Sequence, residues 1–203
     1  ALVNKMDRTG ADFFRTLEMM TDRLGTIPVP IQLPIGSAEQ FSGIVDLIGL
    51  RGLVWDEANL GTTVHEIDIP EEMMGIVTEY REKLIETIVE SNDELLAKYV
   101  DGIELSDEEI IAGLRKATLC GSVVPVLCGS ALKNRGVQPL LDAVISYLPS
   151  PVDVPPIAGL DPRTQEMQER LPHDDEPFCA LAFKIMTDPH VGKLTFLRVY
   201  SGV

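Results

Sequence analysis

The chain has 203 residues, 45% hydrophobic and 24% charged, with a formal net charge of −15 at pH 7. This composition indicates a globular protein of one large or two modest domains, and no stretch approaches the roughly 18 apolar residues of a membrane span or forms a signal peptide. The three cysteines and three histidines lack metal-ligand spacing. We therefore expect a cytoplasmic protein with reduced thiols, no zinc site, and neither a membrane nor DNA as partner.

The first motif is Asn4-Lys5-Met6-Asp7, directly after a short apolar segment. Guanine offers two adjacent donors, N1–H and the 2-amino group, which the two oxygens of an ionised Asp7 can accept, whereas adenine would be rejected. Asn4 has the amide to address the other edge of the base and to tie neighbouring loops together. The Lys5 stem can lie over the purine ring, and Met6 should point away from it. A surface turn before an N-capping Asp is the alternative interpretation.

The elements that follow are predicted from periodicity and capping residues. A helix is expected at residues 12–24, with Gly25 as its C-terminal cap, and β-type segments at 29–35, 43–48, 52–55 and 63–69. Further helices are expected at 71–90, 92–100 and 107–120, the last two introduced by capping boxes at residues 91–94 and 106–109. Glu94 and Glu109 are therefore interpreted as capping residues and not as catalytic acids.

The negative charge is concentrated in this central part. Residues 56–110 hold 17 acidic and three basic side chains, and the rest of the chain is nearly balanced, with 15 acidic and 14 basic residues. Such a segment will not bind nucleic-acid phosphate, but it can attract a basic protein surface. A set of well-solvated helices with acidic outer faces is the alternative.

A second motif follows the predicted buried strand at residues 122–128. It reads Gly129-Ser130-Ala131-Leu132, and an amphipathic helix comes after it. Ligands of open α/β sheets bind at the carboxyl ends of strands, so the two motifs suit two walls of one base pocket. Ser130 and Ala131 are small enough for their backbone N–H groups to approach guanine O6, and Leu132 or the Lys133 stem can cover a ring face. An ordinary strand-to-helix loop is the alternative.

The two motifs are too far apart for one βα connection, which needs only about 30 residues. We therefore expect an insertion of roughly 95 residues between them. After the second motif, residues 149–156 contain four prolines and predict a semi-rigid linker. Residues 163–175 are polar and predict a loop, and residues 178–186 and 193–200 alternate as strands do.

Taken together, residues 4–7, 29–36, 126–131, 147–151 and 198–202 resemble bacterial elongation factor G, over essentially the whole chain. The resemblance implies an α/β fold: the C-terminal half of a P-loop-type GTPase domain with an inserted α+β subdomain, then the first strands of a β-barrel domain. The implied parts are GTPase-domain remnants at 1–25 and 121–149, the acidic insert at 26–120, a linker or loop at 150–176, and a truncated barrel at 177–203.

The sequence lacks the Gly-x4-Gly-Lys-Ser/Thr loop that holds nucleotide phosphates. The Asp-x-x-Gly match at residues 7–10 overlaps the guanine motif, and the one at residues 22–25 ends a helix. We therefore expect an internal fragment without phosphate loop, switch segments, catalytic residue or Mg²⁺ ligands, which binds only the guanine base of GTP or GDP and is inactive alone.

For the parent protein, the resemblance implies a GTPase that drives ribosomal translocation of tRNA and mRNA. Its implied partners are the ribosome, the large-subunit stalk protein through the acidic insert, and ribosomal RNA through the second domain. A non-catalytic stalk-binding module is one alternative function. Another is a paralogous translational GTPase of the ribosome-protection or ribosome-release type, and a third is an unrelated domain with a coincidental motif.

Overall fold

A computed structural model describes residues 1–56, 59, 61–90 and 92–203. Contacts between Cα atoms divide the chain into two compact units, residues 1–148 and 149–203, and each is described by itself. None of the helices in the described residues is both long and apolar enough to cross a membrane.

A small parallel sheet lies at the centre of the first unit. Its strands are β1 (Leu2–Val3), β7 (Val124–Cys128) and β2 (Pro28–Pro30), in the order β1-β7-β2. β1 and β2 both run parallel to β7, with Val3 opposite Cys128 and Val29 opposite Pro125. Strands far apart in the sequence are thereby brought together in one sheet.

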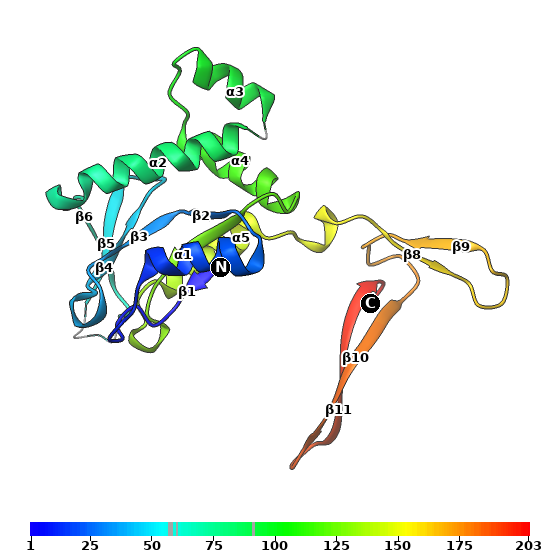
Figure 1. The fold of residues 1–203 in the computed structure, drawn as a ribbon. Helices are drawn as coiled ribbons and strands as arrows, with labels where there is room; N and C mark the ends of the chain where they lie inside the picture. The colour runs from blue at the N-terminus through cyan, green and yellow to red at the C-terminus, as the bar shows by residue number, and fades with distance from the viewer. Residues whose placement is uncertain (57–58, 60, 91) are drawn as a thin grey trace. The chain divides into compact units, whose positions relative to one another are not determined.

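A second, antiparallel sheet follows in the order β3 (Gln32–Ile35), β4 (Gly43–Asp46), β5 (Arg51–Trp55) and β6 (Val64–Ile67), and Figure 1 shows β3, β4 and β5 side by side. The single segment predicted at 29–35 is thus two strands in two sheets. Ile31 is the transition between them: its N–H donates to Val126 of β7, and its carbonyl accepts the N–H of Leu47, directly after β4. The insert was expected to begin at residue 26. Residues 28–30 nevertheless form β2, which is a strand of the parallel sheet.

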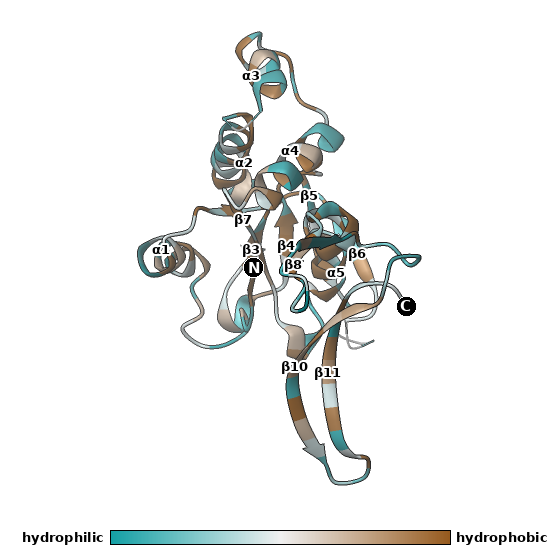
Figure 2. Cartoon of the chain, turned by 90° about the vertical axis from the view of Figure 1, so that its right-hand side faces the viewer, coloured by the Kyte–Doolittle hydropathy of each residue, from teal (hydrophilic) through white to brown (hydrophobic). Residues whose placement is uncertain are grey.

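The helices of this unit agree with the predictions within a few residues. They are α1 (Phe13–Leu24), α2 (Met74–Val89), α3 (Asp93–Val100), α4 (Asp107–Leu119) and α5 (Val137–Tyr147). Gly25 ends α1 with a φ of 63°, and the predicted capping box of Ser106 and Glu109 is present. Helix α3 is capped by Asn92 instead, whose side chain accepts the Glu94 N–H, and the predicted role of Ser91 lies outside the described residues. Figures 1 and 2 show α2, α3 and α4 gathered at one end of the unit.

One hydrophobic core joins both sheets to the helices. It includes Val126 of the parallel sheet, Leu33 and Val45 of the antiparallel sheet, and Leu84 and Ile110 of α2 and α4, all at most 1% exposed. The antiparallel sheet and its helices therefore share the core of the parallel sheet. Burial of this kind contributes about 1.5–3 kcal/mol for each large apolar side chain.

The second unit consists of two antiparallel hairpins. The first pairs β8 (Ile157–Leu160) with β9 (Met167–Arg170), and the second pairs β10 (Cys179–Asp188) with β11 (Gly192–Ser201). The long hairpin confirms the strands predicted at 178–186 and 193–200. The prediction of a loop at 163–175 is wrong in part, because β9 lies within this range. The strand was missed because the residues of β9 do not alternate between apolar and polar. Figure 2 shows hydrophobic residues along both strands of the long hairpin.

Candidate functional site

The two sequence motifs lie at the same edge of the parallel sheet. β1 and β7 are neighbouring parallel strands, and the loops that carry Asn4–Asp7 and Ser130–Leu132 follow their carboxyl ends. The backbone links these loops directly, since Met6 N–H donates to Gly129 O at 3.1 Å and Gly129 N–H donates to Val3 O at 3.0 Å. Residues separated by 127 positions thus meet in one site.

Asn4 connects the two loops through its side chain. Its Oδ1 accepts the N–H of Lys5 at 2.8 Å and the N–H of Ala131 at 2.9 Å. Within the part of the chain that the structure describes, the Nδ2 group of Asn4 makes no hydrogen bond, so it retains two donors for a ligand. Lys5 adopts a φ of 66° and is exposed, which leaves its stem available to a ring above the loop.

Asp7 is held by Ser130 across the site. The buried Ser130 hydroxyl, in a residue that is only 1% exposed, donates to Asp7 Oδ1 at 2.7 Å. This hydrogen bond is the main cause that lowers the pKa of the Asp7 carboxyl, and the positive charges of Lys133 and Arg8 act in the same direction. Asp7 is therefore ionised at neutral pH. A carboxylate with one bond on Oδ1 still has lone pairs for two further donors, which is what the guanine edge presents.

The backbone donors expected for guanine O6 are engaged in this structure. Ser130 N–H donates to Arg135 O at 2.9 Å, and Ala131 N–H donates to the Asn4 side chain. A base oxygen would have to replace one of these acceptors. Exchange at Ala131 only requires rotation of the Asn4 side chain, whereas exchange at Ser130 would open a main-chain bridge.

Met6 is buried and Leu132 is exposed. Met6 is 1% exposed and belongs to the core, and its carbonyl accepts the Ala38 N–H at 2.9 Å. Its contribution to a base site is thus to anchor the loop. Leu132 is 84% exposed and is free to pack on a ligand.

The chain is similar to known proteins over most of its length. Residues 1–150 match the sequence model of the elongation factor Tu GTP binding domain. The chain belongs to this family. A crystal structure of a protein from Thermus thermophilus also resembles it, with a TM-score of 0.75 and 27% sequence identity over 99% of this chain. The chain spans 27% of the length of that protein.

Three residues of this elongation-factor GTP-binding domain were not singled out in the sequence. Arg135 is 6% exposed, makes two backbone hydrogen bonds to Ser130, and donates its guanidinium to Phe41 O. Gly136 has a φ of 81°, and a Cβ there would lie 2.7 Å from Cys128 O. Asn134 adopts a φ of 55°. The sequence pattern Asn134-x-Gly136 could have indicated this loop, because Asn and Gly both tolerate the left-handed backbone conformation with which the loop closes.

No group of three or more His, Cys, Asp or Glu side chains that could hold a metal ion exists among the described residues. Of the cysteines, Cys128 is fully buried, which raises the pKa of its thiol, while Cys120 is exposed.

Proposed function

We propose that the chain supplies the guanine-reading part of the GTP site in a translation factor of the elongation factor G type. The observation that carries the proposal is the ionised Asp7, fixed by Ser130 at the shared edge of two parallel strands. Asn4 braces the loop, Lys5 and Leu132 cover the ring, Ala131 addresses O6, and Met6 anchors the motif in the core. Family membership supports a guanine nucleotide as the ligand.

Catalysis is proposed for the whole protein and not for this chain. The full-length protein would hydrolyse GTP and couple hydrolysis to the movement of tRNA and mRNA on the cytoplasmic ribosome, and its second domain would contact ribosomal RNA. This chain covers about a quarter of the related protein from Thermus thermophilus and offers no assigned catalytic residue or Mg²⁺ ligand. The isolated chain would therefore bind GTP or GDP weakly and hydrolyse nothing.

The proposal is tested by Asp7→Asn in the full-length protein. Asparagine presents a donor where guanine also presents one, so guanine-nucleotide affinity should fall by at least about a hundredfold. Xanthine carries an acceptor in place of the 2-amino group, so xanthine-nucleotide affinity should rise. The matched control is Asp22→Asn, an exposed carboxylate on α1 outside the site, which should change neither affinity. An unchanged preference for guanine in Asp7→Asn would refute the role of Asp7.

A second function, docking of the ribosomal stalk protein, is favoured by the acidic insert. Exposed carboxylates on and beside α2, α3 and α4 give this end of the unit a strongly negative surface: Glu72, Glu82, Glu86, Asp93, Glu94 and Glu108. Such a surface attracts a basic partner in a salt-dependent manner. Titration of the chain with isolated stalk protein should show binding that weakens with salt. Binding by the full-length protein but not by this chain would exclude the insert as a sufficient docking module.

A further inference from the structure

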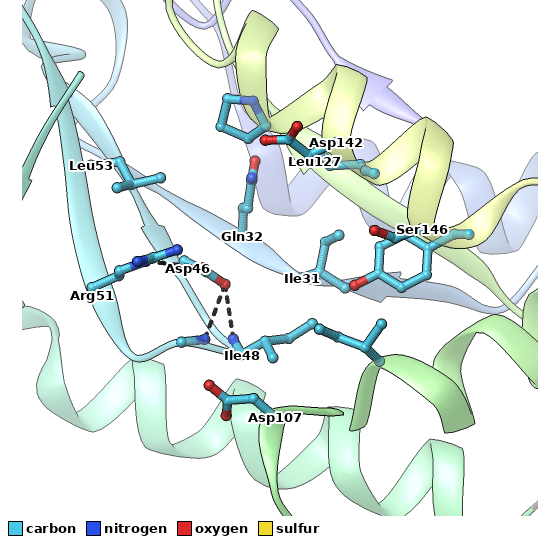
Figure 3. Close-up of a pocket in the computed structure, with 15 residues that line it drawn as sticks. Ile31, Gln32, Asp46, Ile48, Arg51, Leu53, Asp107, Leu127, Asp142 and Ser146 are labelled. Atoms are coloured by element: carbon cyan, nitrogen blue, oxygen red, sulfur yellow. Dashed lines mark hydrogen bonds and ion pairs between the residues drawn. The ribbon is translucent and has the colours of Figure 1, made fainter. Parts of the chain in front are cut away.

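A polar pocket distinct from the guanine site lies between the antiparallel sheet, α4 and α5. It has a volume of about 240 Å³, and none of the guanine-site residues lines it. Its polar side chains are those of Gln32, Asp46, Arg51, Asp107, Asp142, Ser146 and Tyr147. Figure 3 shows Asp46, Asp107 and Asp142 around the pocket, coming from β4, α4 and α5 respectively.

Two buried side chains in this lining have polar atoms without a protein partner. Gln32 is 5% exposed, and the only hydrogen bond of its side chain among the described residues is that of Oε1, which accepts the Cys128 N–H at 3.4 Å. Tyr147 is 6% exposed, and its hydroxyl makes no hydrogen bond to any described residue. Every fully buried side-chain nitrogen or oxygen in the described chain has a partner. Gln32 Nε2 and the Tyr147 hydroxyl therefore retain access to the space they line and are available to a ligand there.

The charges that face this space are predominantly negative. Asp46 Oδ1 accepts the N–H groups of Ile48 and Gly49, while Oδ2 lies 3.6 Å from Arg51 Nε. Arg51 is also engaged elsewhere, because its Nη1 lies 2.6 Å from Glu66 Oε1.

The other two carboxylates belong to exposed residues at the edge of the pocket. Asp107 lies 3.8 Å from the Arg81 guanidinium, and Asp142 has no ion-pair partner within the described residues. Burial, and then the negative charge of Asp46, raises the pKa of Tyr147 to about 12, so this hydroxyl stays neutral and can both donate and accept. Three carboxylates thus line this space, while the Arg51 guanidinium is shared between Asp46 and Glu66 and the Arg81 guanidinium lies near Asp107.

We propose that this pocket binds a small organic cation with an ammonium or guanidinium group. Its N–H groups would bond to the carboxylates of Asp46 and Asp142 and to the Tyr147 hydroxyl. The volume equals roughly eight water molecules at about 30 Å³ each, which suits a short-chain amine and is too small for a nucleotide. A bare metal ion does not fit, because the described carboxylates do not converge on one point.

The test uses the 203-residue chain and agmatine, a four-carbon chain with an ammonium at one end and a guanidinium at the other. Calorimetry should show saturable binding of agmatine and none of the neutral 1,4-butanediol. Asp142→Asn should weaken binding by about tenfold, since it removes a charge-assisted hydrogen bond. Tyr147→Phe, which removes only the hydroxyl, should also weaken it, and the fluorescence of Trp55 reports whether either variant stays folded.

The matched control is Asp22→Asn, which removes one negative charge from an exposed helical position remote from the pocket. It should leave the affinity for agmatine unchanged. Absence of saturable binding would overturn the proposal. Equal weakening by Asp22→Asn and Asp142→Asn would overturn it too, because it would indicate general attraction to an acidic protein.

Discussion

The hydrogen bond between Ser130 and Asp7 gives a sharp test of the site geometry through Ser130→Ala. A hydrogen bond to a charged group contributes about 1.5–3 kcal/mol, and water competes at the partly exposed Asp7, so we expect a loss of about 1–2 kcal/mol in the free energy of unfolding. Packing should be unaffected because alanine occupies nearly the same space. Urea unfolding of the 1–148 unit can be followed by fluorescence of Trp55, the single tryptophan, which is 5% exposed.

The pH dependence of this effect distinguishes the charged bond from a packing defect. The folded-state pKa of Asp7 is lowered, so its stabilisation is fully present above the ordinary aspartate value of 3.8 and is lost as the pH falls through the folded-state pKa. The difference between Ser130→Ala and the parent chain should shrink in that acidic range. The exposed Ser122→Ala is the control and should stay within about 0.5 kcal/mol. A Ser130→Ala effect below about 0.5 kcal/mol at pH 7, or one independent of pH, would refute the reasoning.

Further predictions concern the loop, the core and the thiols. Gly136→Ala should lower the free energy of unfolding by about 1–3 kcal/mol, since the Gly136 φ of 81° is unfavourable for alanine. Gly75→Ala in α2, with open space around the added Cβ, should raise the free energy of unfolding by about 0.5–1 kcal/mol. Urea unfolding that gives the two changes the same sign would contradict this. Leu114→Ala in the core, at a position with no exposure, should cost about 2–5 kcal/mol in the same assay, and a cost below about 1 kcal/mol would be incompatible with a packed insert. A thiol reagent followed by mass spectrometry should label the exposed Cys120 rapidly and Cys128 only on unfolding; equal rates would show that Cys128 is accessible.

Elements with local signals could be predicted from the sequence alone. Helix α1 begins after a capping Asp12 and ends at Gly25, and α4 begins with the reciprocal bonds of Ser106 and Glu109. Such signals depend only on residues three or four positions apart, so they are visible in sequence. The division of one apolar segment into two strands at Ile31 is not visible in the sequence, because it depends on which distant strand each half pairs with.

The candidate site shows the same distinction. The adjacency of its two loops followed from the general rule for parallel strands, and the Asn4 bond to Ala131 matches the bracing expected of this amide. The occupation of the Ser130 N–H by Arg135 O could not be predicted, because main-chain hydrogen bonds in a loop carry no side-chain signature.

The segment between the two motifs contributes to the proposed base site, because it supplies backbone atoms to both loops. Ala38 N–H donates to Met6 O, the Phe41 carbonyl accepts from Arg135, and the Gly61 carbonyl accepts from Asn134 at 3.2 Å. Each of these bonds reaches one of the two loops that carry the residues proposed to read guanine. The contacts use main-chain groups of the intervening segment, so they constrain the path of its chain and not the identity of its side chains. The orientation of the proposed site residues therefore depends on correct folding of the segment that separates them in sequence.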